Sequence, residues 1–119
     1  MTVQRGDVVL VDFPFANGTG SKIRPAVVVQ SDHNNGRIAN TVVAMITRRT
    51  HKAASEPTQL LIDPKTADGQ TTGLAMVSAI TCENLFTVNQ RRVTRTLGKV
   101  SPATMQAVDD CLKAALALQ

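Results

Sequence analysis

Two short apolar runs constrain this chain most: one opens on Arg-Pro and the other closes on Thr-Arg-Arg. The first covers residues 24–30 and the second covers residues 41–49. Their length and their β-branched residues predict strands rather than helices. Proline favours an extended conformation in the residue before it. We therefore expect Arg24 at the mouth of a strand, with Pro25 at its first position or at a sheet edge.

If these two strands pair, the start of one and the end of the other lie at the same end of the sheet. Arg24, Thr47, Arg48 and Arg49 would then gather there, with no carboxylate between them. A guanidinium can hold two phosphate oxygens at once. Such a cluster suits a phosphate group.

The remaining pattern predicts a mainly β protein, a small antiparallel barrel or curled sheet with one C-terminal packing helix. Ser101 is a natural N-cap, Pro102 suits the first helical position, and apolar residues recur at helical spacing from Met105 to Leu116. Strands are expected at residues 8–13, 26–30, 41–47, 57–63, 78–88 (with a break near 83–84) and 96–100. Loops are expected at residues 14–22, 31–40, 48–56 and 64–73.

Composition limits the size of the fold and the kind of partner. The 119 residues suffice for one domain, residues 1–119, with one sizeable core. Thirteen Lys and Arg against nine Asp and Glu give a net charge of +4. This excess is compatible with a nucleic-acid partner, but equally with a soluble protein of high pI. With three Phe and neither Tyr nor Trp, a nucleic-acid reader built on aromatic stacking is not expected.

The cysteines and the hydropathy pattern bear on cofactors and location. Cys82 and Cys111 have no metal-ligand spacing, so we expect buried thiols in a reducing compartment and neither a metal nor another cofactor. No signal-peptide pattern and no run long enough for a bilayer is present. A cytoplasmic protein without membrane contact is the expectation.

In their order and spacing, these elements resemble the MazF/PemK family of toxin endoribonucleases over nearly the whole chain. The resemblance implies an SH3-like barrel, a homodimer, and metal-independent cleavage of single-stranded RNA at short sequence motifs. It also implies a cognate antitoxin whose acidic, disordered tail blocks the toxin. The segments that carry the resemblance are residues 5–8, 24–29, 44–47, 73–78, 87–92 and 97–118.

The family's catalytic Arg and Thr match Arg24 and Thr47. In such a reaction the RNA 2′-OH attacks the adjacent phosphorus and leaves a 2′,3′-cyclic phosphate and a 5′-OH. Arg24 suits electrostatic stabilisation of the developing charge. Because arginine stays charged in proteins, it is a poor general base, and the acid and base assignments stay open.

Several other residues are secondary candidates. Lys22, Arg48, Arg49 and Lys52 would either contact RNA phosphates or form an ordinary solvated charge run. His51, and less so His33, could supply acid–base chemistry, although both also read as exposed loop residues. Ser78 belongs to the matching pattern.

Glu83 is a further secondary candidate of a different kind. Some PemK-like members carry a basic and an acidic residue two apart on the equivalent strand. Here Thr81 stands in the basic position before Glu83. The missing basic partner favours Arg24 with Thr47.

Two alternatives remain on the same fold. A gyrase-poisoning toxin would depend on its C-terminal end, but residues 116–119 and the lack of Trp count against it. A member that only binds RNA or antitoxin is the other alternative, and the retention of Arg24 and Thr47 counts against it.

Overall fold

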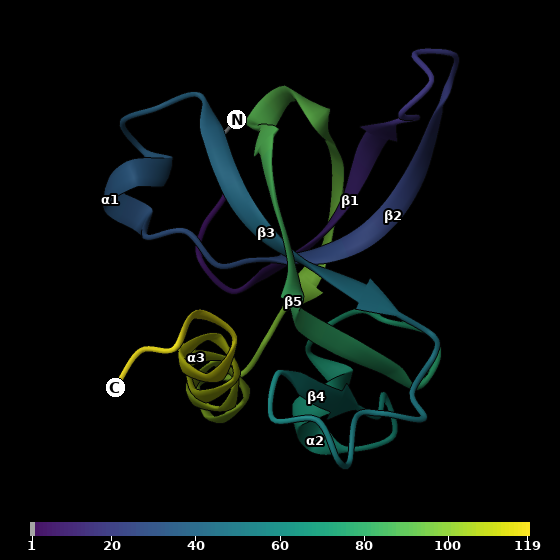
Figure 1. The fold of residues 1–119 in the computed structure, drawn as a ribbon, viewed down its shortest axis with the longest axis vertical. Helices are drawn as coiled ribbons and strands as arrows, with labels where there is room; N and C mark the ends of the chain where they lie inside the picture. Colours follow the sequence, from purple (N-terminus) through teal and green to yellow (C-terminus); the bar gives the residue numbers. More distant parts are fainter. Residues whose placement is uncertain (1) are drawn as a thin grey trace.

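The protein folds as a six-stranded antiparallel sheet with a long C-terminal helix (Figure 1). The structure is a computed structural model that describes residues 2–119. Its elements are β1 (Asp7–Pro14), β2 (Ser21–Val28), α1 (Asp32–Asn35), β3 (Asn40–Thr47), β4 (Gln59–Ile62), α2 (Ala67–Gln70), β5 (Ser78–Asn89), the 3-10 turn η1 (Gln90–Arg92), β6 (Val93–Lys99) and α3 (Pro102–Leu116).

The strand order in the sheet is β4-β5-β3-β2-β1-β6. β1 therefore lies between β2 and β6, the latter from the opposite end of the chain. The prediction of a mainly β protein with a C-terminal helix is confirmed. The sheet runs from one edge strand to the other within residues 2–119, so the closed SH3-like barrel stays a prediction.

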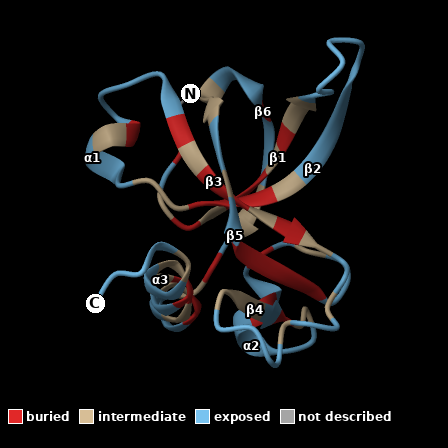
Figure 2. Cartoon of the chain, viewed as in Figure 1, coloured by how far each residue is buried: buried red, intermediate tan, exposed pale blue. Residues whose placement is uncertain are grey.

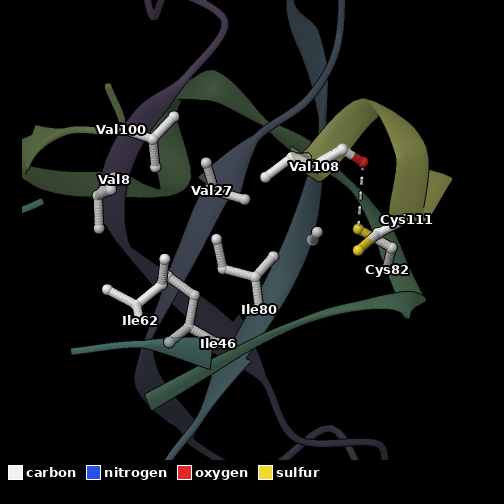
Figure 3. Close-up of a cluster of buried hydrophobic side chains, with 10 residues drawn as sticks. Val8, Val27, Ile46, Ile62, Ile80, Cys82, Val100, Val108 and Cys111 are labelled. Carbon is white, nitrogen blue, oxygen red and sulfur yellow. Dashed lines mark hydrogen bonds between the residues drawn. The ribbon is translucent and has the colours of Figure 1, made fainter. Parts of the chain in front are cut away.

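Two apolar clusters hold the sheet. The first packs α3 against the sheet, with Val108 and Cys111 of the helix facing Val27, Ile80 and Cys82 (Figure 3). The second cluster includes Val9, Val11, Ala26, Val28 and Val43. Because successive side chains of a strand point to opposite faces, β1, β2 and β3 contribute to one cluster on each face of the sheet. Figure 2 shows that burial concentrates where the strands cross, whereas the β1–β2 hairpin tip is exposed.

The two cysteines lie in the first cluster with their sulfurs side by side (Figure 3). Both are free thiols. Burial, followed by the neighbouring Cys111, raises the pKa of Cys82 to about 12, and burial also raises the pKa of Cys111. The prediction that both are buried thiols is confirmed, and they act as apolar core residues.

The start and end of α3 follow its sequence signals. Ser101 caps the helix by accepting a hydrogen bond from the Thr104 N–H, and Pro102 occupies the first turn, as predicted. Arg5 links α3 to the end of β2. Its Nη2 lies 2.6 Å from Asp109 Oδ1 on α3, and the Arg5 Nε donates a hydrogen bond to the Val29 carbonyl at 2.8 Å.

Several predicted boundaries were wrong. β2 begins at Ser21 rather than at residue 26, because β1 and β2 stay paired out to Pro14 and Ser21. The expected long loop at residues 14–22 is thus a hairpin whose connection covers only residues 15–20. Residues 31–40 and 64–73 contain the one-turn helices α1 and α2, each with a side-chain N-cap, Ser31 and Thr66.

No helix within residues 2–119 has the length and apolar character needed to cross a membrane.

Candidate functional site

A cavity opens where β2 and β3 stop pairing. Their last paired residues are Ala26 and Met45, and Arg24 and Thr47 each lie two residues beyond that pair. Pro25 has no N–H to donate, which suits the end of this ladder. Pro25 therefore lies inside β2, paired with β1 on one side and without a β3 partner on the other. Of its two predicted places, the first position of a strand is wrong, whereas the edge of the sheet agrees with the missing β3 partner.

The pocket that results has a volume of about 710 Å³ and combines a cationic rim with an apolar floor. Lys22, Arg24, Arg48 and Arg49 supply the cations, and all four are exposed. Leu10, Pro25, Ile46, Leu74 and Leu97 supply the apolar surface. The structure therefore brings Arg24 and Thr47 into one pocket together with three of the other predicted cations.

The Thr47 hydroxyl is held by the chain that follows it. Its Oγ1 accepts a hydrogen bond from the Arg49 N–H at 3.1 Å. Because this contact uses a lone pair of the oxygen, the hydroxyl proton stays available to a ligand. The half-buried Thr47 side chain is thus oriented as a hydrogen-bond donor.

One wall of the pocket is the segment of residues 73–76, which lies against β6. Gly73 has a φ of 73°, and a Cβ on it would stand 2.1 Å from the Leu97 carbonyl oxygen. Ser78 is buried and its Oγ donates to the Met76 carbonyl at 2.8 Å. The predicted secondary residue Ser78 therefore lines the pocket and fixes this wall.

The electrostatics of the pocket are one-sided. No Asp or Glu lines it among residues 2–119, and no ion pair found there includes Arg24. The described ion pairs join Arg5 to Asp109, Arg92 to Asp12 and Lys99 to Asp7. Unpaired guanidinium groups beside a donor hydroxyl favour a bound anion, above all a phosphate with several oxygens.

Other predicted candidates lie outside this pocket. His51 and Lys52 lie in an exposed turn after β3 and His33 lies in α1; none of the three lines the cavity. Glu83 lies on β5, where its Oε2 accepts a hydrogen bond from Gln59 Nε2 at 2.7 Å.

Sequence reasoning missed the floor and wall of the pocket. Leu10 and Leu97 come from strands at opposite ends of the chain, and Met76 from an irregular segment. The sequence around these residues gives no sign of a site, because Leu10 and Leu97 come together only through the pairing of β1 with β6. Within residues 2–119 no group of three or more His, Cys, Asp or Glu could hold a metal ion.

This fold and pocket define a small β protein with a cation-lined pocket at a strand junction. The family model described as "PemK-like, MazF-like toxin of type II toxin-antitoxin system" matches residues 4–116. The chain belongs to this toxin family.

Relatives and solved structures agree with this assignment. The chain is 33% identical over 119 residues to Endoribonuclease EndoA of Bacillus subtilis (strain 168), covering 99% of this chain and 97% of the relative. It is similar to an endoribonuclease in complex with its cognate antitoxin from a mycobacterial species (TM-score 0.73, 27% identity, 98% and 97% of the two chains). A MazE–MazF structure from Deinococcus radiodurans shares the fold (TM-score 0.77, 18% identity, full coverage of both chains).

Proposed function

We propose that this chain is the toxin of a type II toxin–antitoxin system and a metal-independent, sequence-specific endoribonuclease. It cleaves single-stranded RNA through attack of the 2′-OH, leaving 2′,3′-cyclic phosphate and 5′-OH ends. The observation that carries the proposal is the pocket in which Arg24 and Thr47 lie together among further cations and without a carboxylate. Family membership and the endoribonuclease EndoA at 33% identity support it.

The chemistry suits the groups present. Attack of the 2′-OH on phosphorus forms the 2′-O–P bond and breaks the bond to the 5′-oxygen, while negative charge builds on the non-bridging oxygens. The 2′-OH proton passes through solvent water to the leaving 5′-oxygen, which departs as a 5′-OH. Arg24 donates two hydrogen bonds to the non-bridging oxygens, and the free proton of the Thr47 hydroxyl supplies a third. One such donor is typically worth about two to three powers of ten in rate.

Neither of these side chains accepts a proton at neutral pH, since a guanidinium has no acceptor and a hydroxyl is a weak base. No His, Asp or Glu of residues 2–119 lines the pocket. We therefore assign Arg24 and Thr47 to stabilisation of charge and to positioning of the phosphate. Lys22, Arg48 and Arg49 hold the neighbouring phosphates of the strand.

Mutants of the two residues test the proposal on a mixed RNA pool with mapped 5′ ends. Arg24→Ala should lower the rate by at least about a hundredfold, and Arg24→Lys should restore little because lysine cannot hold two oxygens in a fork. Arg91→Ala is the matched control, since Arg91 is an exposed arginine outside the pocket. Cleavage at the wild-type rate by Arg24→Ala would refute the assignment.

The Thr47 hydroxyl is tested separately from its methyl group. Thr47→Ser should keep part of the activity and Thr47→Ala should lose most of it. Equal rates for the two variants would make Thr47 purely structural. The wild-type rate should also survive excess EDTA; loss on chelation with recovery on addition of a divalent ion would contradict the metal-free mechanism.

Regulation follows from the same surface. We propose a cytoplasmic homodimer whose cognate antitoxin has an acidic, disordered tail that folds over the cationic rim and displaces RNA. The mycobacterial endoribonuclease similar to this chain was solved with its cognate antitoxin. A competition titration with Arg24→Ala protein at fixed ionic strength tests this, with the dimer checked by light scattering. RNA that stays bound while the antitoxin peptide binds tightly would place the two partners on separate surfaces.

The gyrase-poisoning alternative gains nothing from the structure. Its expected contact region follows α3, where residues 117–119 are Ala-Leu-Gln.

A further inference from the structure

The register between β3 and β5 breaks beside the pocket. Ala44 pairs with Leu85, but the next residue, Met45, pairs with Thr81. Three residues of β5, 82–84, therefore have no partner on β3, and β5 has a bulge at this point. Bulges often re-aim a side chain next to a functional site.

This bulge carries a polar cluster that joins β4 to β5. Gln59 Nε2 donates to Glu83 Oε2 at 2.7 Å, and Asn84 Nδ2 donates to Thr81 Oγ1 at 3.2 Å. Thr81 Oγ1 in turn donates to the Met45 carbonyl at 2.8 Å. We call these four side chains, Gln59, Thr81, Glu83 and Asn84, the bulge cluster.

One polar atom of the bulge cluster is left without a partner. Gln59 Oε1 is buried and accepts no hydrogen bond within the described chain. An unpaired buried acceptor is unfavourable and needs an explanation. The Gln59 amide is oriented by its Nε2, which donates a hydrogen bond to Glu83 Oε2 and so leaves Oε1 on the side without a partner. Glu83 itself is exposed, has no ion-pair partner within residues 2–119, and keeps Oε1 and further lone pairs available.

Two members of the bulge cluster, Gln59 and Thr81, lie on the same face of the sheet as Thr47, and Glu83 is hydrogen-bonded to Gln59. Thr47 pairs with Ala79, Met45 pairs with Thr81, and Thr81 pairs with Gln59 on its other side. Paired residues share a face, and so do residues two apart along a strand. Thr81 is thus roughly 7 Å along the sheet from Thr47, and Glu83, four residues along β5 from Ala79, is roughly 13 Å from it, comparable to two nucleotide steps of an extended RNA.

We propose that the bulge cluster is a base-recognition subsite in which Glu83 reads a guanine within about two nucleotides of the scissile phosphate. The inference rests on the proposed function and adds its sequence preference. A carboxylate repels phosphate, so an RNA crossing this point presents a base rather than its backbone. Single-stranded RNA exposes the Watson–Crick edge.

Guanine fits the geometry of a fixed carboxylate better than the other bases. Its Watson–Crick edge carries two neighbouring donors, N1–H and the N2 amino group, which match the two oxygens of Glu83. Cytosine, adenine and uracil each offer one donor group on that edge. Gln59 is a positioning residue: it holds Oε2 while that oxygen's second lone pair and Oε1 face the base.

The experiment compares base frequencies around the cut sites in a random RNA pool for the wild type, Glu83→Gln and Glu56→Gln. Glu56→Gln is the matched control, because Glu56 is an exposed glutamate outside the pocket and the bulge cluster. The wild type and the control should favour guanine at one position within two nucleotides of the cut by about tenfold or more. Glu83→Gln should lose that preference at that position alone and keep the others.

A substrate made from the preferred sequence gives the second readout. Replacing that guanine by inosine removes the N2 amino group. The wild type should cut the inosine RNA several-fold more slowly in kcat/KM, whereas Glu83→Gln should cut both RNAs alike, and Gln59→Ala should lie between them. A wild type that cuts RNA without a guanine preference, or a Glu83→Gln variant that keeps it, overturns the subsite alone. A wild type that cuts no RNA overturns the proposed function and the subsite with it.

Discussion

The wall of the pocket depends on a contact that only glycine permits, and Gly73→Ala tests it. Alanine at Gly73 meets two obstacles: the left-handed φ of 73°, and a Cβ 2.1 Å from the Leu97 carbonyl oxygen. The backbone conformation costs about 1–2 kcal/mol for a residue with a Cβ. The overlap forces residues 73–76 or β6 to move by about an ångström, and overpacking of this kind costs about 1–3 kcal/mol more.

Gly18→Ala separates the two costs. Gly18 has nearly the same φ, 77°, but a Cβ there meets nothing within 4 Å. Gly18→Ala should therefore lose only the conformational part, about 1–2 kcal/mol. Gly73→Ala should lose about 3 kcal/mol or more, equivalent to roughly 10 °C in Tm for a chain of this size.

Urea unfolding gives the stabilities, and RNA cleavage at a temperature where both variants are folded gives the activities. Displacing a wall of the pocket by an ångström should lower cleavage by Gly73→Ala by about a hundredfold. Equal losses of stability in the two variants would show that the contact with Leu97 is not tight. An active, stable Gly73→Ala protein would refute the role of this wall.

Three further predictions follow from the same structure. A double-mutant cycle of Arg5→Ala and Asp109→Ala, measured by urea unfolding, should give a coupling free energy of about 1 kcal/mol, because the two side chains are 2.6 Å apart but about a third exposed. A coupling of zero would mean that the ion pair does not hold α3. The raised pKa of Cys82, about 12 in the folded protein against 9.0 for the free thiol, predicts that stability falls as pH rises from 9 towards 12, by up to about 1.4 kcal/mol per pH unit. The unfolded thiol ionises there and the folded one does not, and the chain has no Tyr to titrate in that range; Cys82→Ala should flatten the slope, and an unchanged slope would contradict the assignment. If four cations contact RNA phosphates, a plot of the logarithm of the RNA-binding constant against the logarithm of the salt concentration should have a slope of about −3. Arg48→Ala should reduce the size of this slope by about 0.7, whereas Arg91→Ala should not change it. Equal slopes for the two variants would place Arg48 outside the RNA contact.

The sequence predicted those parts of the fold whose signals are local. The strand after Asn40 has a β-branched run, and α3 has a cap, a proline and an apolar stripe, so both were predicted within a residue or two. The prediction of Pro25 at the first position of a strand was wrong, because a proline is excluded from a strand interior only where its missing N–H would face a paired neighbour. That neighbour, β3, ends its pairing with β2 at Met45, which no local pattern reveals.

The candidate site divides in the same way. Arg24 and Thr47 could be placed at one end of the sheet because two recognisable strands carry them. The floor residue Leu97 and the bulge at residues 82–84 depend on pairing between distant segments. The catalytic roles and the RNA contacts stay predictions for the experiments above.

The place of β1 between β2 and β6 has a consequence for how the toxin is made. β1 is synthesised before β6, its second partner, and Arg5 cannot contact Asp109 until more than a hundred further residues have been made. The pocket needs Leu97 beside Leu10, so an incomplete chain on the ribosome lacks the floor of its own site. Pairings this distant in sequence are slow to form. A newly made chain therefore passes through an interval in which its pocket is not yet assembled, and the RNA cleavage proposed above cannot occur during that interval.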